Sequence, residues 1–169
     1  LAGGTPIILE CNEKQGFKIN PVELEKLIKP KTKWIILNSP SNPTGACYTE
    51  KDIRDIGEVL KKYPHIYILS DDIYEHVTYE EFKFFTIAQI DSFKDRVLTM
   101  NGVSKAYSMT GWRIGYAAGP TEIIKAIAKI QSQSTTNPSS ISQAAAVEAL
   151  SGTQDFIKER ATSFQERRD

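Results

Sequence analysis

The sequence predicts an α/β fold in which a mostly parallel sheet is flanked by helices and carries one antiparallel strand. Short β-branched and apolar runs alternate with segments of helical period. The runs at 33–38 and 66–70 have continuous apolar centres, which is typical of strands buried on both faces of a parallel sheet. The run at 96–100 also predicts a buried strand, and the Asn101-Gly102 pair after it predicts a turn. The segment 101–113 carries glycines instead of the helix that a parallel crossover needs, so we expect 114–118 to run antiparallel to 96–100.

Composition narrows the possible partners and sites. The 169 residues suffice for one domain with a sizeable core. Lys plus Arg and Asp plus Glu are 21 each, so no net charge draws the chain to nucleic acid or to a membrane surface, and we expect neither as a partner. Apolar runs are far too short to span a bilayer and no signal sequence opens the chain, which favours a cytoplasmic protein. The two cysteines and two histidines lack the spacing of a disulfide framework or a metal site, and we expect no metal.

The first part of the chain predicts a strand, a helix and a second strand. The apolar run 6–11 is the first strand candidate. Asn20 is suited to cap a helix that has Pro21 at its first position, and this helix should end at Pro30. The strand at 33–38 follows.

The middle of the chain predicts one amphipathic helix and one strand before the pattern loosens. Thr49 and Asp52 resemble a capping box. The helix that they begin should end near 63–64 and bury one apolar stripe, formed by Ile53, Ile56, Val59 and Leu60. The strand at 66–70 comes next, and 79–85 mixes charges with aromatic residues, so we expect irregular structure there.

Three helices are predicted after the antiparallel strand. The first begins at Thr121, the second at Ser139 or Ser140, and the third at Thr153. The last helix has no stop signal before the end of the chain. This pattern favours a piece of a larger protein.

Polar residues follow each of three predicted strands. They occupy 38–45, 71–74 and 101–105, and parallel strands would bring these ends to one edge of the sheet, where ligands bind in open α/β folds. Lys105 lies among small residues and could form a Schiff base, while Arg113 could bind a phosphate.

Each of these residues also has a simpler interpretation. The segment 41–45 could be only a turn, and Lys105 could be a solvated loop residue. Asp71 and Asp72 could cap a helix or lie in water, although Asp71 and Tyr74 are spaced to face the same side.

Three segments resemble the signature blocks of the class I aminotransferases, the fold type I pyridoxal-phosphate enzymes. They are SNPTG at 41–45, SDDIYEH at 70–76 and SKAYSMTGWRIGYAAGP at 104–120, in matching order and spacing. The third block is highly specific. The sequence is most similar to the bacterial branch that includes aspartate and prephenate aminotransferases. The resemblance implies that 1–169 is the central part of the cofactor-binding large domain, without the small domain.

The resemblance also implies a role for each candidate residue. Lys105 would hold pyridoxal 5'-phosphate covalently and carry a proton during catalysis. Asp71 would pair with the pyridine nitrogen, and Asn42 and Tyr74 would hydrogen-bond the ring oxygen. Arg113 would bind the phosphate. The sequence departs from the family at Gly102, where many members carry a serine that binds the phosphate.

The implied function is transfer of an amino group from an amino acid, aspartate or glutamate, to a 2-oxo acid by a homodimeric enzyme. Two alternatives stay open: a pyridoxal-phosphate lyase of the same fold, such as a carbon-sulfur lyase, and a non-catalytic aminotransferase-like module of a regulator. The family's remaining parts supply further cofactor contacts and the clamp for the substrate carboxylate. We therefore expect the 169-residue chain alone to be inactive.

Overall fold

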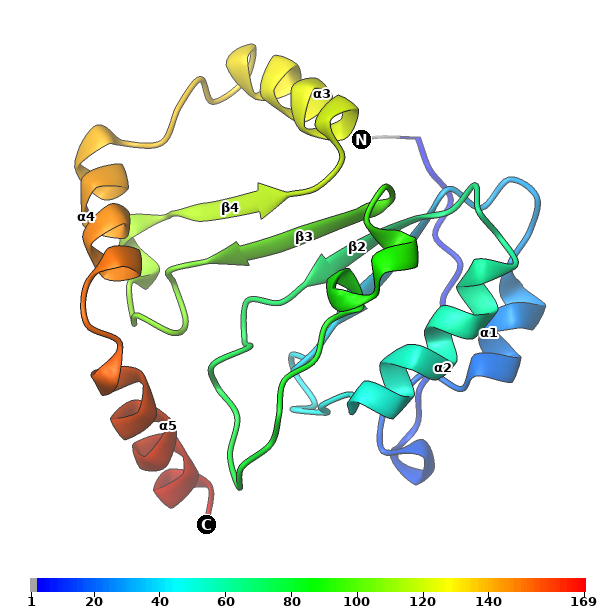
Figure 1. The fold of residues 1–169 in the computed structure, drawn as a ribbon, viewed down its shortest axis with the longest axis horizontal. Coiled ribbons are helices and arrows are strands. Elements are labelled where there is room, and N and C mark those ends of the chain that lie inside the picture. Colours follow the sequence, from blue (N-terminus) through cyan, green and yellow to red (C-terminus); the bar gives the residue numbers. More distant parts are fainter. Residues whose placement is uncertain (1–2) are drawn as a thin grey trace.

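A computed structural model of the chain describes residues 3–169, whose centre is a four-stranded sheet of order β1-β2-β3-β4 (Figure 1). The first three strands are parallel and the fourth is antiparallel to β3. Their bounds are β1 Trp34–Asn38, β2 Tyr67–Asp71, β3 Val97–Gly102 and β4 Gly115–Ala118. This architecture confirms the predicted fold class, including the antiparallel strand.

The strand register aligns the carboxyl ends of the parallel strands. Asn38 pairs with Asp71, which in turn pairs with Met100. The loops that follow β1, β2 and β3 therefore begin at the same edge of the sheet, as the sequence predicted. This edge carries the candidate residues described below.

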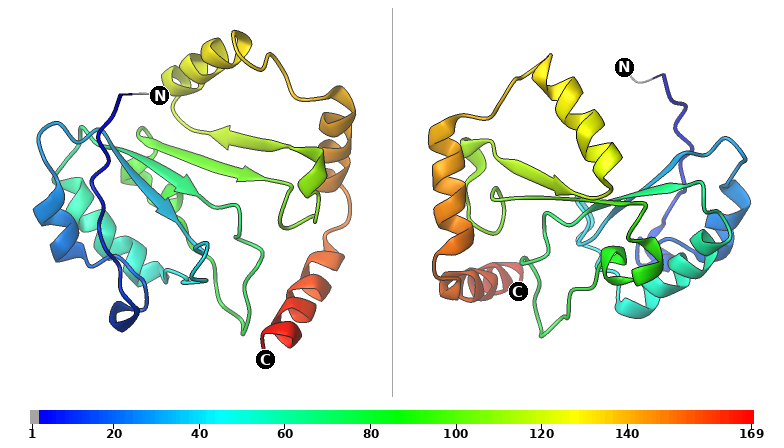
Figure 2. Two further views of the ribbon diagram at one scale, coloured as in Figure 1. Left: turned by 180° about the vertical axis from the view of Figure 1, so that it is seen from behind. Right: turned by 45° about the horizontal axis from the view of Figure 1, so that its top comes forward.

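Two helices, α1 (Pro21–Leu27) and α2 (Glu50–Lys61), cover one face of the sheet (Figure 2). Both begin as predicted, because the Asn20 side chain accepts hydrogen bonds from the first turn of α1, and Thr49 and Asp52 form a capping box at α2. The whole apolar stripe of α2 is buried. It packs in one core with Leu24, Leu37, Ile68, Ile87 and Phe93.

The opposite face of the sheet is largely open, which corrects one prediction. Ile36 is 67% exposed and Trp34 is also exposed, whereas Leu37 on the helix-covered face is buried. Successive side chains of a strand point to opposite faces, and within residues 3–169 the core that α1 and α2 form lies on the Leu37 side. On the Ile36 side, α3 lies only near β3 and β4, where it lines a cleft. Burial of β1 on both faces was therefore a wrong expectation.

Two local predictions also fail. The segment 6–11 is not a strand, because it pairs with none of the strands in the described residues, and Ile8 is 74% exposed. Asn101 and Gly102 do not form a turn but continue β3, where they pair with Tyr116 and Gly115 of β4. The pairing of β3 with β4 therefore outweighs the tendency of an Asn-Gly pair to form a turn.

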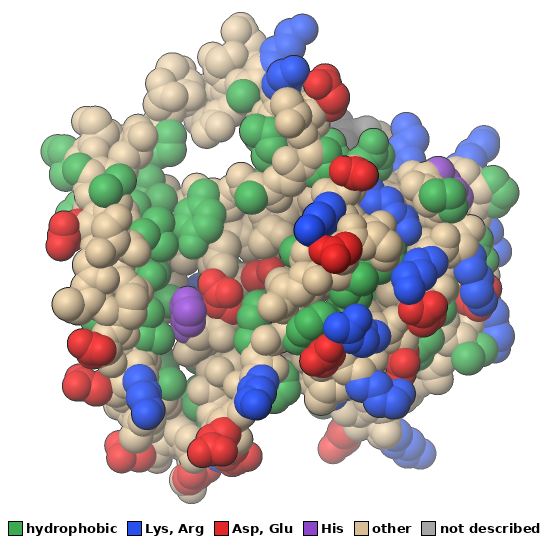
Figure 3. Space-filling view, in the orientation of Figure 1, with side chains coloured by type: hydrophobic (Ala, Val, Ile, Leu, Met, Phe, Trp, Pro, Cys, Tyr) green, Lys and Arg blue, Asp and Glu red, His purple; other side chains and the backbone are tan. Residues whose placement is uncertain are grey.

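The remaining helices lie around the periphery and bury little (Figure 1). They are α3 Thr121–Ser132, α4 Ser140–Ser151 and α5 Asp155–Arg168, the last beginning two residues after the predicted Thr153. Figure 3 shows charged side chains gathered over α1 and α2, whereas hydrophobic side chains are exposed along α4. Within residues 3–169, no helix is both long and apolar enough to cross a bilayer.

Candidate cofactor site

Asn38, the last residue of β1, joins the loops after β1 and β2. Its amide Nδ2 donates a hydrogen bond to the carbonyl oxygen of Asp71 at 3.1 Å, and its Oδ1 accepts one from the backbone N–H of Asn42 at 3.0 Å. Both loops are thereby fixed to the end of one strand. The sequence placed Asn38 at this edge, but its positioning role became visible only in the structure.

Asn42, Tyr74 and Lys105 come from three loops and meet at this edge. The Asn42 amide Nδ2 donates to the Tyr74 hydroxyl at 3.2 Å, and Lys105 Nζ lies 5.4 Å from the centroid of the Tyr74 ring. The Lys105 side chain is half-buried, so its amine is held against an aromatic face while remaining accessible. Three of the predicted site residues are thus in one contiguous group.

Asp71 and Arg113 line a neighbouring cleft of about 550 Å³ between the ends of β3 and β4 and helix α3. Arg113 has a left-handed backbone (φ 53°), and its guanidinium donates one hydrogen bond to the carbonyl of Thr110 at 2.8 Å. Ser104, directly before Lys105, lines the same cleft. From the sequence, Ser104 was only one of the small residues beside Lys105, although its place in the lysine block was a signal that it belongs to the site.

The adjacent acids Asp71 and Asp72 have different environments. Asp72 is 4% exposed and its carboxylate accepts a hydrogen bond from the Ser70 hydroxyl at 2.7 Å, so it neither caps a helix nor lies in water. Burial raises the pKa of Asp72, and hydrogen bonds from Ser70 and Thr86 oppose this shift. Asp71 is the acid that lines the cleft.

Gly102 lies where β4 approaches β3 most closely. A Cβ atom at this position would be 2.9 Å from the carbonyl oxygen of Ile114 and 3.2 Å from the Cα of Gly115. Both neighbours are backbone atoms that cannot move aside easily. The β3–β4 pairing therefore explains why this chain has glycine where a serine was expected from the resemblance.

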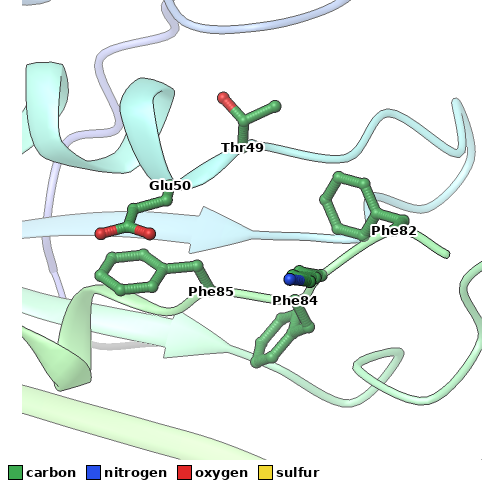
Figure 4. A pocket seen from close by; sticks show the side chains of 6 residues that line it. Thr49, Glu50, Phe82, Phe84 and Phe85 are labelled. Carbon is green, nitrogen blue, oxygen red and sulfur yellow. The ribbon is translucent and has the colours of Figure 1, made fainter.

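A second, separate pocket contains none of the predicted residues. Thr49, Glu50 and the segment 82–85 line it, with three phenylalanines around a shallow opening (Figure 4). None of the candidate cofactor-site residues lines it. Within residues 3–169 there is also no group of three or more side chains suited to hold a metal ion.

The grouped side chains fit one kind of ligand. An amine can bond covalently to an aldehyde, and a guanidinium can form a bidentate contact with a phosphate. A carboxylate can pair with a protonated ring nitrogen. The Asn42 amide and the Tyr74 hydroxyl, already in contact with each other, can bond a ring oxygen. Together they suit a phosphorylated pyridine aldehyde.

Comparison with known proteins shows which family this chain is similar to. The family model "Aminotransferase class I and II" matches residues 1–169. The chain is 58% identical to the "Probable aspartate/prephenate aminotransferase" of Rickettsia bellii over all of this chain and 43% of that protein. It is 57% identical to the "Aspartate aminotransferase" of Rhizobium meliloti, covering 98% of this chain and 41% of that protein.

Solved structures agree with the sequence relatives. The crystal structure of the Rhizobium meliloti aspartate aminotransferase superimposes with a TM-score of 0.96 at 57% identity, covering 98% of this chain and 42% of that one. A mutant of the Thermus thermophilus aspartate aminotransferase gives 0.92 at 40% identity, covering 99% of this chain and 46% of that one. The chain thus spans less than half the length of these relatives. With its signature blocks placed around one site and its whole length matched by the family model, the chain belongs to the class I and II aminotransferases.

Proposed function

We propose that this chain forms the cofactor-binding centre of a pyridoxal-phosphate-dependent aminotransferase, which transfers an amino group from aspartate or glutamate to a 2-oxo acid. The observation that supports this most directly is the contact of Lys105 with Tyr74 and of Tyr74 with Asn42, beside a cleft lined by Asp71 and Arg113. Nothing in the site favours the lyase or the regulatory module.

In this proposal each residue has one task. Lys105 holds the cofactor covalently and later moves a proton at the substrate Cα. Asp71 keeps the pyridine nitrogen protonated, and Asn42 with Tyr74 binds the ring oxygen. Arg113 binds the phosphate, and the hydroxyl of Ser104, which lines the same cleft, adds a hydrogen bond to it. When bound, pyridoxal phosphate supplies the electron sink for the substrate carbanion.

Substrate and assembly are proposed from the relatives. The matched proteins are named for aspartate, or for aspartate and prephenate, and we propose one of these specificities here. The chain represents the central part of the large domain, and we propose a cytoplasmic homodimer as the working assembly of the complete enzyme. These properties stay predictions from the resemblance.

Covalent trapping of the cofactor tests the proposed role of Lys105. The complete protein is incubated with pyridoxal phosphate, reduced with borohydride, digested and mapped by mass spectrometry. The cofactor mass should be found on the peptide that contains Lys105 and should disappear after addition of excess aspartate before reduction. A label on another lysine, or none, would contradict the proposal.

A further inference from the structure

A carboxylate beside the site connects two of its loops. Glu75 Oε1 accepts a hydrogen bond from the Asn101 amide Nδ2 at 2.7 Å, and the Glu75 side chain is only 29% exposed. Glu75 follows Tyr74 directly, while Asn101 belongs to β3, the strand that leads to Lys105. The bond therefore joins the loop that carries the phenol to the strand that carries the amine.

The same loop is fixed to β3 at a second point. The backbone N–H of Asp72 donates to the carbonyl of Met100 at 2.9 Å, beyond the last residue of β2. Between the two attachments the chain turns tightly, with the N–H of Glu75 bonded to the carbonyl of Asp72 at 2.9 Å. Tyr74 lies inside this turn. Its position relative to β3 thus depends on one backbone bond and one side-chain bond.

The orientation of the Asn101 amide is determined from both sides. Its Oδ1 accepts a hydrogen bond from the N–H of Gly102 at 2.7 Å, which directs its Nδ2 toward Glu75. An acceptor is therefore required at position 75, and a carboxylate makes a stronger bond than a neutral group. The bond is short and lies within the partly buried wall of the site.

The other titratable groups near Glu75 are a histidine, two phenols and the buried carboxyl of Asp72, whose pKa the charge of Glu75 raises further. His76 Nε2 lies 3.4 Å from the carboxylate. Burial raises the pKa of Tyr107 and of Tyr116, and the charge of Glu75 raises both further. Neither phenol offers the carboxylate a hydrogen bond among the described contacts, so the Asn101 amide is its principal partner.

We propose that Glu75 and Asn101 are positioning residues, whose hydrogen bond sets the placement of Tyr74 against Lys105. The inference rests on the proposed function, in which Lys105 holds the cofactor and Tyr74 binds its ring oxygen. Tyr74 acts on the cofactor only if its hydroxyl stays within hydrogen-bond distance, and displacements of about 1 Å can cost on the order of a hundredfold in rate. The Glu75–Asn101 bond prevents such a displacement.

The test exchanges the two partners in the complete holoprotein. Asn101→Asp places two carboxylates together and breaks the bond, while the double variant Glu75→Gln with Asn101→Asp restores an amide–carboxylate pair in the reverse sense. Glu75→Leu removes the acceptor. The control is Glu80→Gln in the same segment, whose carboxylate binds Arg168 at 2.6 Å instead of β3.

The first readout is the pH midpoint of the absorbance change of bound pyridoxal phosphate. Loss of the Tyr74 hydrogen bond to the ring oxygen should raise this midpoint by about half a pH unit or more in Asn101→Asp and in Glu75→Leu. The double variant and the Glu80→Gln control should keep the wild-type midpoint. A general loss of stability would not produce this reversal.

The second readout does not require the cofactor. In protein freed of pyridoxal phosphate, the Tyr74 ring lies against one side of the Lys105 amine. Acylation of Lys105 should therefore be several times faster in Asn101→Asp and return to the wild-type rate in the double variant. Unchanged midpoints and acylation rates in both bond-breaking variants would overturn the inference while the trapped cofactor on Lys105 upholds the proposed function. If no cofactor is trapped, the proposed function fails and the acylation rates alone decide the inference.

Discussion

Helices α2 and α3 are both twelve residues long and both carry a regular apolar stripe, yet only one of them is buried. Ile56 and Leu60 of α2 are fully buried beneath the sheet, whereas Ile130 of α3 is 70% exposed and α3 has no buried residue. Helical period therefore predicts the secondary structure of a segment. Burial additionally requires a partner surface, which α2 finds on β1 and β2.

The same contrast divides the molecule into a packed half and an open half. The packed half comprises β1, β2, α1 and α2, whose side chains share one core. The open half comprises β4 and the helices α3 to α5, which contribute few buried residues. The candidate site lies at the boundary, where loops from the packed half meet the cleft of the open half. Substitutions should accordingly separate stability from activity.

The largest expected effect is at Lys105, which lies at the boundary between the packed and open halves, where a substitution should remove activity but not stability. Lys105→Ala should lower kcat of the complete enzyme by at least about a thousandfold, because covalent binding and proton transfer depend on this amine. Its melting temperature, compared with that of wild type in the cofactor-free state, should change by less than about 3 °C. A stable variant with more than a tenth of wild-type activity would contradict the assignment.

The adjacent acids Asp71 and Asp72 should differ in their effect on activity. Asp71→Asn should slow deprotonation of the substrate Cα by about 3 kcal/mol, roughly a hundredfold, because only an anion favours the protonated pyridine. Asp72→Asn should slow it much less, since Asp72 is buried against Ser70 and faces away from the cleft. Substrate deuterium exchange at Cα measures this step. Equal losses in both variants would argue against the different roles.

Matched isoleucines test the packed half against the open half directly. Ile56→Ala in α2 should lower the free energy of unfolding by about 2–5 kcal/mol, because a fully buried side chain leaves a cavity. Ile130→Ala in α3 is the control, and it should change the free energy by no more than about 0.5 kcal/mol. Urea unfolding of this chain gives both values. Similar losses would mean that the α3 stripe is packed in solution.

The β3–β4 pairing predicts a smaller, local cost. Gly102→Ala should lower the free energy of unfolding by about 1–3 kcal/mol, since the new Cβ would be 2.9 Å from the carbonyl oxygen of Ile114. Gly111→Ala serves as control, because no atom lies within 4 Å of its added Cβ. If both variants unfold at the same urea concentration, the close approach of β4 is not as tight as described.

The smallest expected effect depends on pH. Burial raises the pKa of Asp72 above its value in the unfolded chain. Ionisation of this carboxyl therefore lowers the stability of the folded state. The loss is absent below the unfolded pKa and develops as pH rises through the folded pKa. Asp72→Asn cannot ionise. Between about pH 3 and pH 7 the stability of this variant should therefore rise relative to wild type. A difference that stays constant, or moves in favour of wild type, would contradict the buried environment.

The sequence alone determined the backbone plan and the locations of the candidate residues. The strand runs at 33–38, 66–70 and 96–100, the caps at Asn20 and Thr49, and the short segment before β4 depend on local chemistry, and the structure confirms them. The run at 6–11 was the exception, because it has no strand partner among the described residues. Because parallel strands share their carboxyl edge, the positions of Asp71 and Lys105 after two strands were enough to bring them to one region. Their roles toward a cofactor stay proposals.

Only the tertiary structure decided which of these groups are buried and which bonds join them. Asp71 and Asp72 are alike in sequence, but Ser70 and Thr86 surround one of them and leave the other at the cleft. In the sequence Gly102 predicts a turn, but in the structure it pairs with β4. The Glu75–Asn101 bond joins residues 26 positions apart. Local patterns encode the path of the backbone, whereas desolvation and hydrogen bonding depend on neighbours that only the folded chain supplies.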